Sequence, residues 1–347
     1  MIIRNKYRFT QQISMTILLI VFLVPFSFAQ DIHFSQYNMS PLNLNPATTG
    51  FFEGTYRFTL NNRTQWRAVT TPYTTTSVSA DKQLLKRSFK QDMFGAGLVI
   101  YRDKAGDSDF GTTQINGSFS WIKALNKKSN QYISFAIQPG IAQRTINYEK
   151  LMFDSQYNGS SYDPNLSNNE QFSTKNFFFF DINAGAYWFY KYKKNLSFDG
   201  GLALFHLNTP HQSLFDNKNI RLDRKLVINA NSVVNINPKF DLLPSILFMN
   251  QGKYRELDLG AALRYINDPR VVNYMAFSFG LWLRAKDATL LSAQIDYHKV
   301  SLGISYDINI SNLTPASNER GGLEIALKYI LDKKGPVIIR SVPCPIF

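Results

Sequence analysis

The sequence has few of the residues that build disulfide frameworks and metal centres. Of its 347 residues one is cysteine, Cys344, and four are histidine. A single cysteine excludes an intrachain disulfide and a cluster of cysteine ligands. The four histidines, His33, His206, His211 and His298, contain no His-x3-His pair of the helical metal-binding kind. We therefore expect neither a metal nor a cofactor.

Catalytic motifs are missing as well. The chain contains no G-x-S-x-G nucleophile elbow and no glycine-rich phosphate loop. The nearest approach to a catalytic pair is His298 with Ser301 or Asp296, and neighbours at this spacing arise by chance in strands. A nucleophile without a positioned base is weak, so the sequence predicts a protein that is not an enzyme.

Long apolar runs are missing beyond the first thirty residues. Basic residues precede an apolar stretch at 13–24, and Ala29 ends a small-x-small cleavage site. This pattern predicts a secretory signal peptide over residues 1–29, because the apolar run is short for a transmembrane anchor. An exported chain without spanning helices can still cross a membrane as a closed barrel.

What the chain has in place of long runs is alternation. Residues 300–310 read V-S-L-G-I-S-Y-D-I-N-I, with a large apolar residue at nearly every second position. A period of two indicates a strand with one apolar and one polar face. The hydrophobic fraction of 44% with a mean hydropathy of −0.20 shows that the two kinds are interleaved. An aromatic content of 14% is typical of the two aromatic girdles of membrane barrels.

Similar segments, about fourteen in number and about ten residues long, recur after Gly54. The most regular lie at 56–61, 114–121, 133–141, 256–264, 275–284, 291–298, 300–310 and 322–329, and less regular ones at 73–84, 93–102, 177–191, 196–208, 225–237 and 240–250. In the less regular set, Phe177 to Phe180 interrupts the alternation and is expected at a membrane interface. A soluble sandwich could show the same alternation, but a barrel with a lipid-facing exterior and a polar lumen explains both faces.

The segments between the strands alternate in length. Longer ones, such as 103–110, 151–175, 209–223 and 311–321, follow odd-numbered strands, and short ones follow many even-numbered strands. Outer-membrane barrels have long external loops and short periplasmic turns. The sequence thus predicts an all-β, antiparallel, up-and-down transmembrane barrel over residues 53–331, located in the outer membrane with both termini periplasmic. Residues 30–52 and 332–347, both proline-containing, are expected to form a plug-like periplasmic segment and a periplasmic tail.

Basic residues gather in the short turns. The chain carries a net charge of +13, yet its lysines do not follow a helix, and an exported protein rarely meets nucleic acid, so we expect no nucleic-acid partner. A cationic rim could dock an acidic periplasmic partner or simply contact lipid headgroups. The residues expected to bind partners are Lys127, Lys128, Lys193, Lys194, Lys333 and Lys334, and in the tail Pro343, Cys344, Pro345 and Phe347.

Two stretches carry a resemblance to a known family. The mature start, Q-D-I-H-F-S-Q-Y-N-M-S-P-L-N-L-N-P-A-T-T-G from Gln30 to Gly50, resembles the N-terminus of the PorP/SprF family. So do N-R-T-Q-W from Asn62 to Trp66 and the final C-P-I-F, in which Ile346 replaces the usual basic residue. The resemblance covers the whole mature chain in length and order.

The resemblance implies an outer-membrane barrel of Bacteroidota that belongs to the type IX secretion system. Its implied role is the secretion or cell-surface anchoring of large adhesin-like proteins, including those of gliding motility. The implied partners are outer-membrane lipid, the C-terminal domain of a secreted adhesin, and periplasmic and outer-membrane secretion components. A porin or FadL-like channel for small or hydrophobic solutes is the alternative function.

Overall fold

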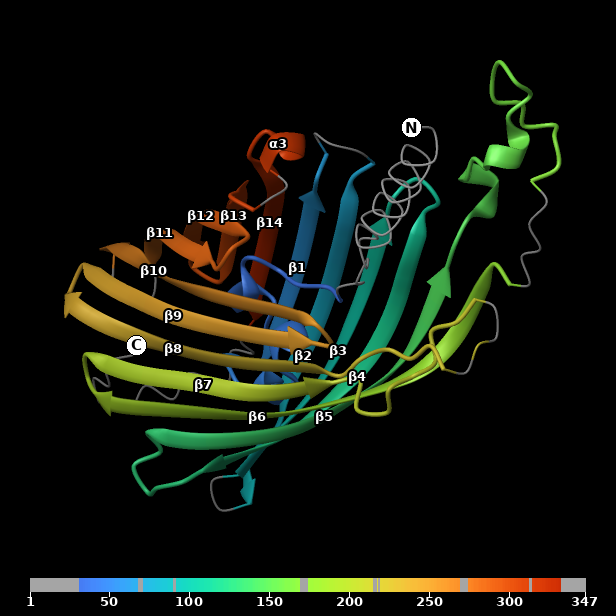
Figure 1. Cartoon of the computed structure of the whole chain (residues 1–347). Helices are drawn as coiled ribbons and strands as arrows, with labels where there is room; N and C mark the ends of the chain where they lie inside the picture. Colours follow the sequence, from blue (N-terminus) through green and yellow to red (C-terminus); the bar gives the residue numbers. More distant parts are fainter. Residues whose placement is uncertain are drawn as a thin grey trace, which may run out of the picture. The chain divides into compact units, whose positions relative to one another are not determined.

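The computed structural model describes residues 31–67, 71–89, 92–168, 174–214, 217, 219–268, 274–311 and 314–331 (Figure 1). The expected signal peptide and the expected C-terminal tail fall outside the described residues. None of the helices within these ranges is long and apolar enough to span a membrane.

Fourteen antiparallel strands form one closed barrel in which each strand pairs with its neighbours in sequence (Figure 1). The ring closes where β1 pairs with β14 over ten residues, from Tyr56 opposite Leu331 to Gln65 opposite Gly322. The predicted fold class is therefore confirmed. The strands are β1 (Tyr56–Gln65), β2 (Tyr73–Phe89), β3 (Asp92–Ala105), β4 (Phe110–Ala124), β5 (Gln131–Thr145), β6 (Asn176–Lys193), β7 (Leu196–Phe205), β8 (Lys225–Asn237), β9 (Phe240–Gln251), β10 (Tyr254–Asp268), β11 (Met275–Arg284), β12 (Ala288–Tyr297), β13 (Val300–Asn309) and β14 (Arg320–Leu331).

Over most of the wall the large apolar side chains face outward and the polar ones face the lumen, although a few apolar side chains, such as Val227, Leu247 and Leu290, are buried inside. In β10, Leu257 and Leu259 are exposed on the outer wall, whereas Glu256 and Asp258 are buried inside. The same division holds in β4, where Ile115 and Phe119 face outward and Asn116 is buried. An exposed apolar exterior around a polar interior is the arrangement that a lipid bilayer requires of a barrel.

The run Phe177–Phe180 does not interrupt the alternation, contrary to the expectation from the sequence. All four residues lie in β6 and pair in register with β5, from Arg144 opposite Phe177 to Ile141 opposite Phe180. Phe178 and Phe180 are exposed, while Phe177 and Phe179 are only partly exposed. A run of four identical residues shows no alternation of residue type, but successive side chains along the strand still point to opposite faces of the wall.

The two rims of the barrel differ. We call the rim at which β1 begins and β14 ends the turn end, and the opposite rim the loop end. At the turn end, residues 194–195, 238–239 and 298–299 are tight connections. At the loop end, residues 146–175, 206–224 and 310–319 form long ones. The connection expected over 103–110 is shorter, because pairing of β3 with β4 continues to Ala105 opposite Phe110.

The segment 32–52, called the N-terminal segment below, folds inside the barrel as three short helices: η1 (Tyr37–Met39), α2 (Pro41–Leu44) and η2 (Pro46–Thr48) (Figure 1). Pro41 and Pro46 each stand at a helix start, where the missing N–H costs nothing. Asn45 caps the last helix by accepting a hydrogen bond from the Ala47 backbone N–H. The buried apolar core of the molecule lies here: Tyr37 packs against a cluster that includes Phe205, Val227, Leu247 and Met249.

Candidate functional site

Polar side chains converge inside the lumen near the loop end. We call this group the loop-end cluster: Arg63, Glu256, Asp258, Arg284, Asp307 and Glu324, all of them buried. They come from β1, β10, β11, β13 and β14, at inward positions that the alternation of each strand fixes. Because burying a charge is costly unless it is paired, the contacts among them decide whether the cluster is stable.

Two guanidinium groups hold the loop-end cluster together. Arg284 lies 3.1 Å from Glu256 and 3.2 Å from Asp258 through Nε, and 3.1 Å from Asp307 through an amino nitrogen. Arg63 contacts Asp307 at 2.7 Å and Glu324 at 3.9 Å. Four carboxyl groups thus share two arginines, and within the described residues Arg63 Nε, Glu256 Oε1 and Asp258 Oδ2 lack a hydrogen-bond partner.

The start of the N-terminal segment docks on this cluster. The Ser35 backbone N–H donates to Glu324 at 2.7 Å, and its hydroxyl donates to Asp307 at 2.8 Å. Arg63 donates to the Ser35 hydroxyl at 2.8 Å, and the Gln36 N–H donates to the other oxygen of Glu324 at 3.0 Å. These bonds link residues up to 289 positions apart in the sequence.

His33 is buried beside the same cluster. Its Nε2 lies 3.9 Å from Glu256, which favours the protonated ring, but burial has the larger effect and lowers the pKa of His33 to about 3. The imidazole is therefore neutral at physiological pH. Sequence reasoning missed this role, because a histidine in a segment without strand or helix periodicity carries no local signal of burial.

The other end of the N-terminal segment is held by an ion pair near the turn end, which we call the turn-end pair. Arg57 donates to both oxygens of Asp81, at 2.9 and 2.8 Å, and also to the Thr48 carbonyl at 2.9 Å. The Gly50 N–H donates to Asp81 at 2.7 Å. A two-point contact between a guanidinium and a carboxylate is among the strongest in proteins, and here both oxygens are satisfied.

Between these two ends the barrel wall carries glycines where the segment touches it. A Cβ at Gly185 would lie 2.1 Å from Asn45 Oδ1, and one at Gly201 would lie 2.4 Å from Asn45 Nδ2. Only glycine leaves room for the Asn45 amide to donate to the Ala186 carbonyl, at 2.9 Å. The inward glycines, which the sequence indicates only as part of a small-residue lumen, are thus a seat for this segment.

A separate buried polar group lies in the wall. His206 Nδ1 is 3.0 Å from Asp181, which also accepts a hydrogen bond from Gln114 at 3.0 Å. Gln114 and Asp181 lie near the loop end of β4 and β6, and His206 directly follows β7. All three side chains are buried. The other histidine of interest, His298, is exposed in the turn after β12, and its ring meets the Tyr297 ring edge to face, with 4.2 Å between the ring centroids.

The lysines expected to bind partners lie where the sequence places them, at the turn end. Lys127 and Lys128 are exposed in the connection from β4 to β5. Lys193 ends β6 and Lys194 follows it, both exposed, one connection further around the rim. Lys333, Lys334, Pro343, Cys344, Pro345 and Phe347 lie outside the described residues.

At the loop end the connection from β5 to β6 folds on itself. It contains the 3-10 helices η3 (Tyr148–Lys150) and η4 (Asp154–Gln156), and the amide of Gln156, at the end of η4, donates to the Leu166 carbonyl at 3.2 Å. Asp109 links the connection to β3, because its carboxyl group forms ion pairs with Lys104 of β3 and with Lys150 of η3. The hydrogen bonds from these two lysines lower the pKa of the Asp109 carboxyl group. The folded connection exposes apolar and aromatic side chains: Met152, Tyr157, Tyr162 and Leu166.

Comparison with protein families gives one match. The family model described as type IX secretion system membrane protein PorP/SprF matches residues 26–329. No match was found among curated proteins.

Several solved structures resemble this chain at low sequence identity. The toluene transporter TodX of Pseudomonas putida is 10% identical, with a TM-score of 0.49 over 86% of this chain and 94% of its own. The monoaromatic hydrocarbon channel CymD is 12% identical, with a TM-score of 0.49 over 89% and 96%. A FadL homologue of Pseudomonas aeruginosa is 9% identical, with a TM-score of 0.43 over 82% and 92%.

Proposed function

Since this chain belongs to the PorP/SprF family of type IX secretion system membrane proteins, we propose that it is a non-enzymatic outer-membrane receptor. It assists the secretion of large adhesin-like proteins or anchors them at the cell surface, including those used in gliding. The observation that carries this proposal is the N-terminal segment, which occupies the lumen and is bonded to the wall near both rims. Because the N-terminal segment fills the lumen, other proteins are expected to bind at the two rims.

The cargo docks at the loop end, on the connection from β5 to β6. Tyr157 and Tyr162 are exposed there, and the residues around them are mostly asparagine, serine and glycine. Tyrosine offers a large contact area at low cost in conformational entropy, and these small polar residues offer adaptable hydrogen bonds. Because Gln156 holds the connection in one fold, less entropy is lost on binding.

The secretion machinery docks at the turn end. Lys127, Lys128, Lys193 and Lys194 are on neighbouring connections and form one cationic patch. Exposed lysines of one sign steer an acidic partner to a surface and set its orientation. In this orientation the turn end faces the periplasm and the loop end faces outward.

The test is recovery of partners from native membranes in mild detergent. The double substitution Tyr157→Ser and Tyr162→Ser is expected to lose the secreted cargo, while Tyr192→Ser, at a similarly exposed tyrosine near the turn end, retains it. Lys127→Glu with Lys128→Glu is expected to lose periplasmic partners, while Lys175→Glu at the loop end retains them. Capture of neither class by the wild type would contradict the proposal.

Reconstitution in liposomes separates this function from the alternative of a solute channel. A barrel held closed by its N-terminal segment is expected to give no steady conductance and no uptake of small or hydrophobic solutes. Steady conductance by the wild-type protein, with no co-purifying protein, would favour the channel instead.

A further inference from the structure

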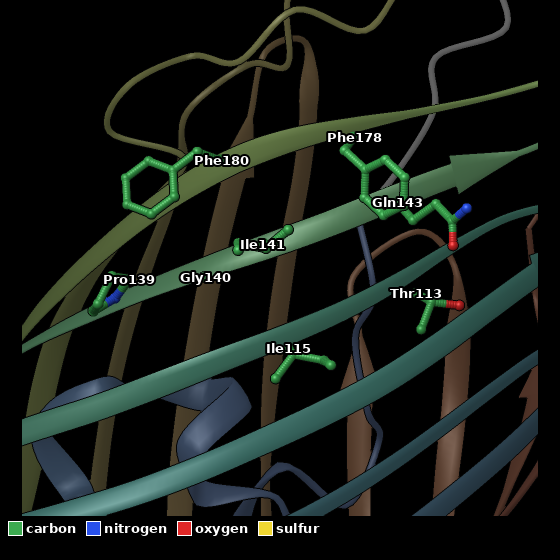
Figure 2. A pocket seen from close by; sticks show the side chains of 8 residues that line it. All are labelled: Thr113, Ile115, Pro139, Gly140, Ile141, Gln143, Phe178 and Phe180. Carbon is green, nitrogen blue, oxygen red and sulfur yellow. The ribbon is translucent and has the colours of Figure 1, made fainter. Parts of the chain in front are cut away.

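The outer wall of the barrel carries a groove of about 480 Å³ across β4, β5 and β6. Figure 2 shows its side chains along the wall, with Pro139 at one end and Thr113 and Gln143 at the other. Pockets of this volume are large enough to enclose much of a small ligand. The groove lies on the outside of the wall, in the loop-end half of β4, β5 and β6, whereas the N-terminal segment lies inside the barrel.

The hollow has a cause in the sequence. Pairing of β4 with β5 stops after Asn116 opposite Gly140 and resumes at Phe119 opposite Ile137. Pro139, which has no N–H to donate, lies in this gap, and Gly117 is opposite it in the same register. Gly117 presents no side chain to the outside, where a Cβ would meet only the Phe119 ring at 3.7 Å. The wall is therefore thin at this point.

The middle of the groove is apolar and faces lipid. Ile115 is opposite Ile141, and Ile141 is opposite Phe180, so the three side chains form one row across the strands. All three are exposed and belong to the outward band of isoleucine, leucine and phenylalanine that surrounds the barrel. At this height the surrounding medium is the bilayer, so acyl chains are what the row meets.

The loop-end side of the groove is polar. Thr113 and Gln143 are opposite each other in the next row, beside Phe178, and both line the groove. A hydroxyl and an amide on a lipid-facing wall cost free energy unless they find hydrogen-bond partners. The ester and headgroup oxygens of a lipid lie at the interface, on the rim side of its acyl chain. The groove is polar toward the loop-end rim and apolar toward the middle of the wall, which is the order of headgroup and acyl chain in a lipid molecule.

We propose that this groove is a binding site for one outer-membrane lipid. An acyl chain lies along Ile115, Ile141 and Phe180 toward Pro139, and the ester region is hydrogen-bonded by Thr113 and Gln143. The site is distinct from general lipid contact because it is a hollow of defined volume, lined by an apolar row and a polar row beside the gap in the β4–β5 ladder.

The test uses the full barrel in nanodiscs containing a phosphatidylethanolamine with a photoreactive acyl chain. Crosslinks mapped by mass spectrometry are expected to concentrate on β4–β6. Ile115→Trp fills the groove and is expected to lower crosslinking there about tenfold, because a few methylene groups lose their contacts. Leu291→Trp on β12 is the matched control, since Ile115 and Leu291 are 49% and 47% exposed. Circular dichroism is the check that both variants fold.

A second variant tests the polar row. Thr113→Val with Gln143→Leu is expected to reduce the lipid retained through detergent washing, while crosslinking of the acyl chain in nanodiscs continues. Crosslinks spread evenly around the wild-type barrel, or equal losses in Ile115→Trp and Leu291→Trp, would overturn the proposal. So would a membrane protein that co-purifies with the wild type and is lost only in Ile115→Trp, because the groove would then be a protein contact.

Discussion

The two attachments of the N-terminal segment differ in how well their charges are matched. At the turn-end pair one guanidinium meets one carboxylate, and both oxygens of Asp81 are bonded. At the loop-end cluster two guanidinium groups face four carboxyl groups, and Glu256, Asp258 and Arg63 each keep an atom without a hydrogen-bond partner within the described residues. A matched pair fixes a chain, whereas a crowded cluster is sensitive to anything that changes its charge. The comparison predicts that the loop-end attachment opens first.

The largest effect is expected from Arg57→Met, which leaves the buried carboxylate of Asp81 without its cation. Removing one partner of a buried pair costs about 3–5 kcal/mol, and we expect this loss in the free energy of unfolding measured in urea with lipid vesicles. The double variant Arg57→Met with Asp81→Leu should recover most of the loss. If the double variant is no more stable than the single one, the pair is not what fixes this end.

A smaller effect is expected from Arg284→Met in the loop-end cluster. Arg63 still faces Asp307 and Glu324 in this variant. Glu256 and Asp258 lose Arg284, and we expect these neighbouring carboxyl groups to bind a proton rather than stay charged, so the loss is that of charged hydrogen bonds, about 1.5–3 kcal/mol. Hydrogen exchange should show the loss as faster opening of residues 32–40, with residues 48–52 still protected. Equal loss of protection at both attachments would mean that they open together.

Lowering the pH below neutral is expected to weaken the loop-end attachment of the N-terminal segment. The pKa of His33 is about 3 when docked, against 6.5 for a free histidine, so the released segment binds the extra proton. Docking is therefore at full strength above pH 6.5 and is lost progressively as the pH falls toward 3. Exchange protection of residues 32–40, corrected for the intrinsic rate at each pH, should fall by up to about tenfold per pH unit.

The variant His33→Gln provides the control for this pH dependence. Glutamine is polar and does not titrate, so the slope should flatten over the same interval. A slope that persists in this variant would assign the pH dependence to the carboxyl groups of the cluster rather than to His33.

The smallest effect is expected from Ser35→Ala, which removes the hydroxyl between Asp307 and Arg63 but keeps the backbone bond to Glu324. The loss of such hydrogen bonds is about 1 kcal/mol. Protease cleavage within the N-terminal segment should become measurably faster. Ser40→Ala is the matched control, because the Ser40 hydroxyl bonds Asn43 within the segment rather than the wall.

The sequence predicts the wall better than it predicts the interior. Alternation alone identifies which residues of β10 and β4 face outward, because a strand gives each position one of two directions. It cannot place Ser35 against Asp307 and Glu324, since those partners are 272 and 289 residues away and no local pattern links them. For the same reason the sequence does not predict that Asn45 packs against Gly185 and Gly201. A glycine leaves space beside the backbone, but the sequence does not show which residue occupies that space.

The seam where β1 meets β14 also constrains how the protein is made. Asp307 and Glu324, which receive Ser35, belong to the last two strands to be synthesised. Ser35 must therefore wait for nearly the whole polypeptide before its partners exist, and contacts between such distant positions form slowly. Docking of the N-terminal segment and closure of the barrel are therefore expected to be coupled late steps of biogenesis, and a barrel that closes before the segment docks leaves Asp307 and Glu324 without the hydrogen bonds from Ser35.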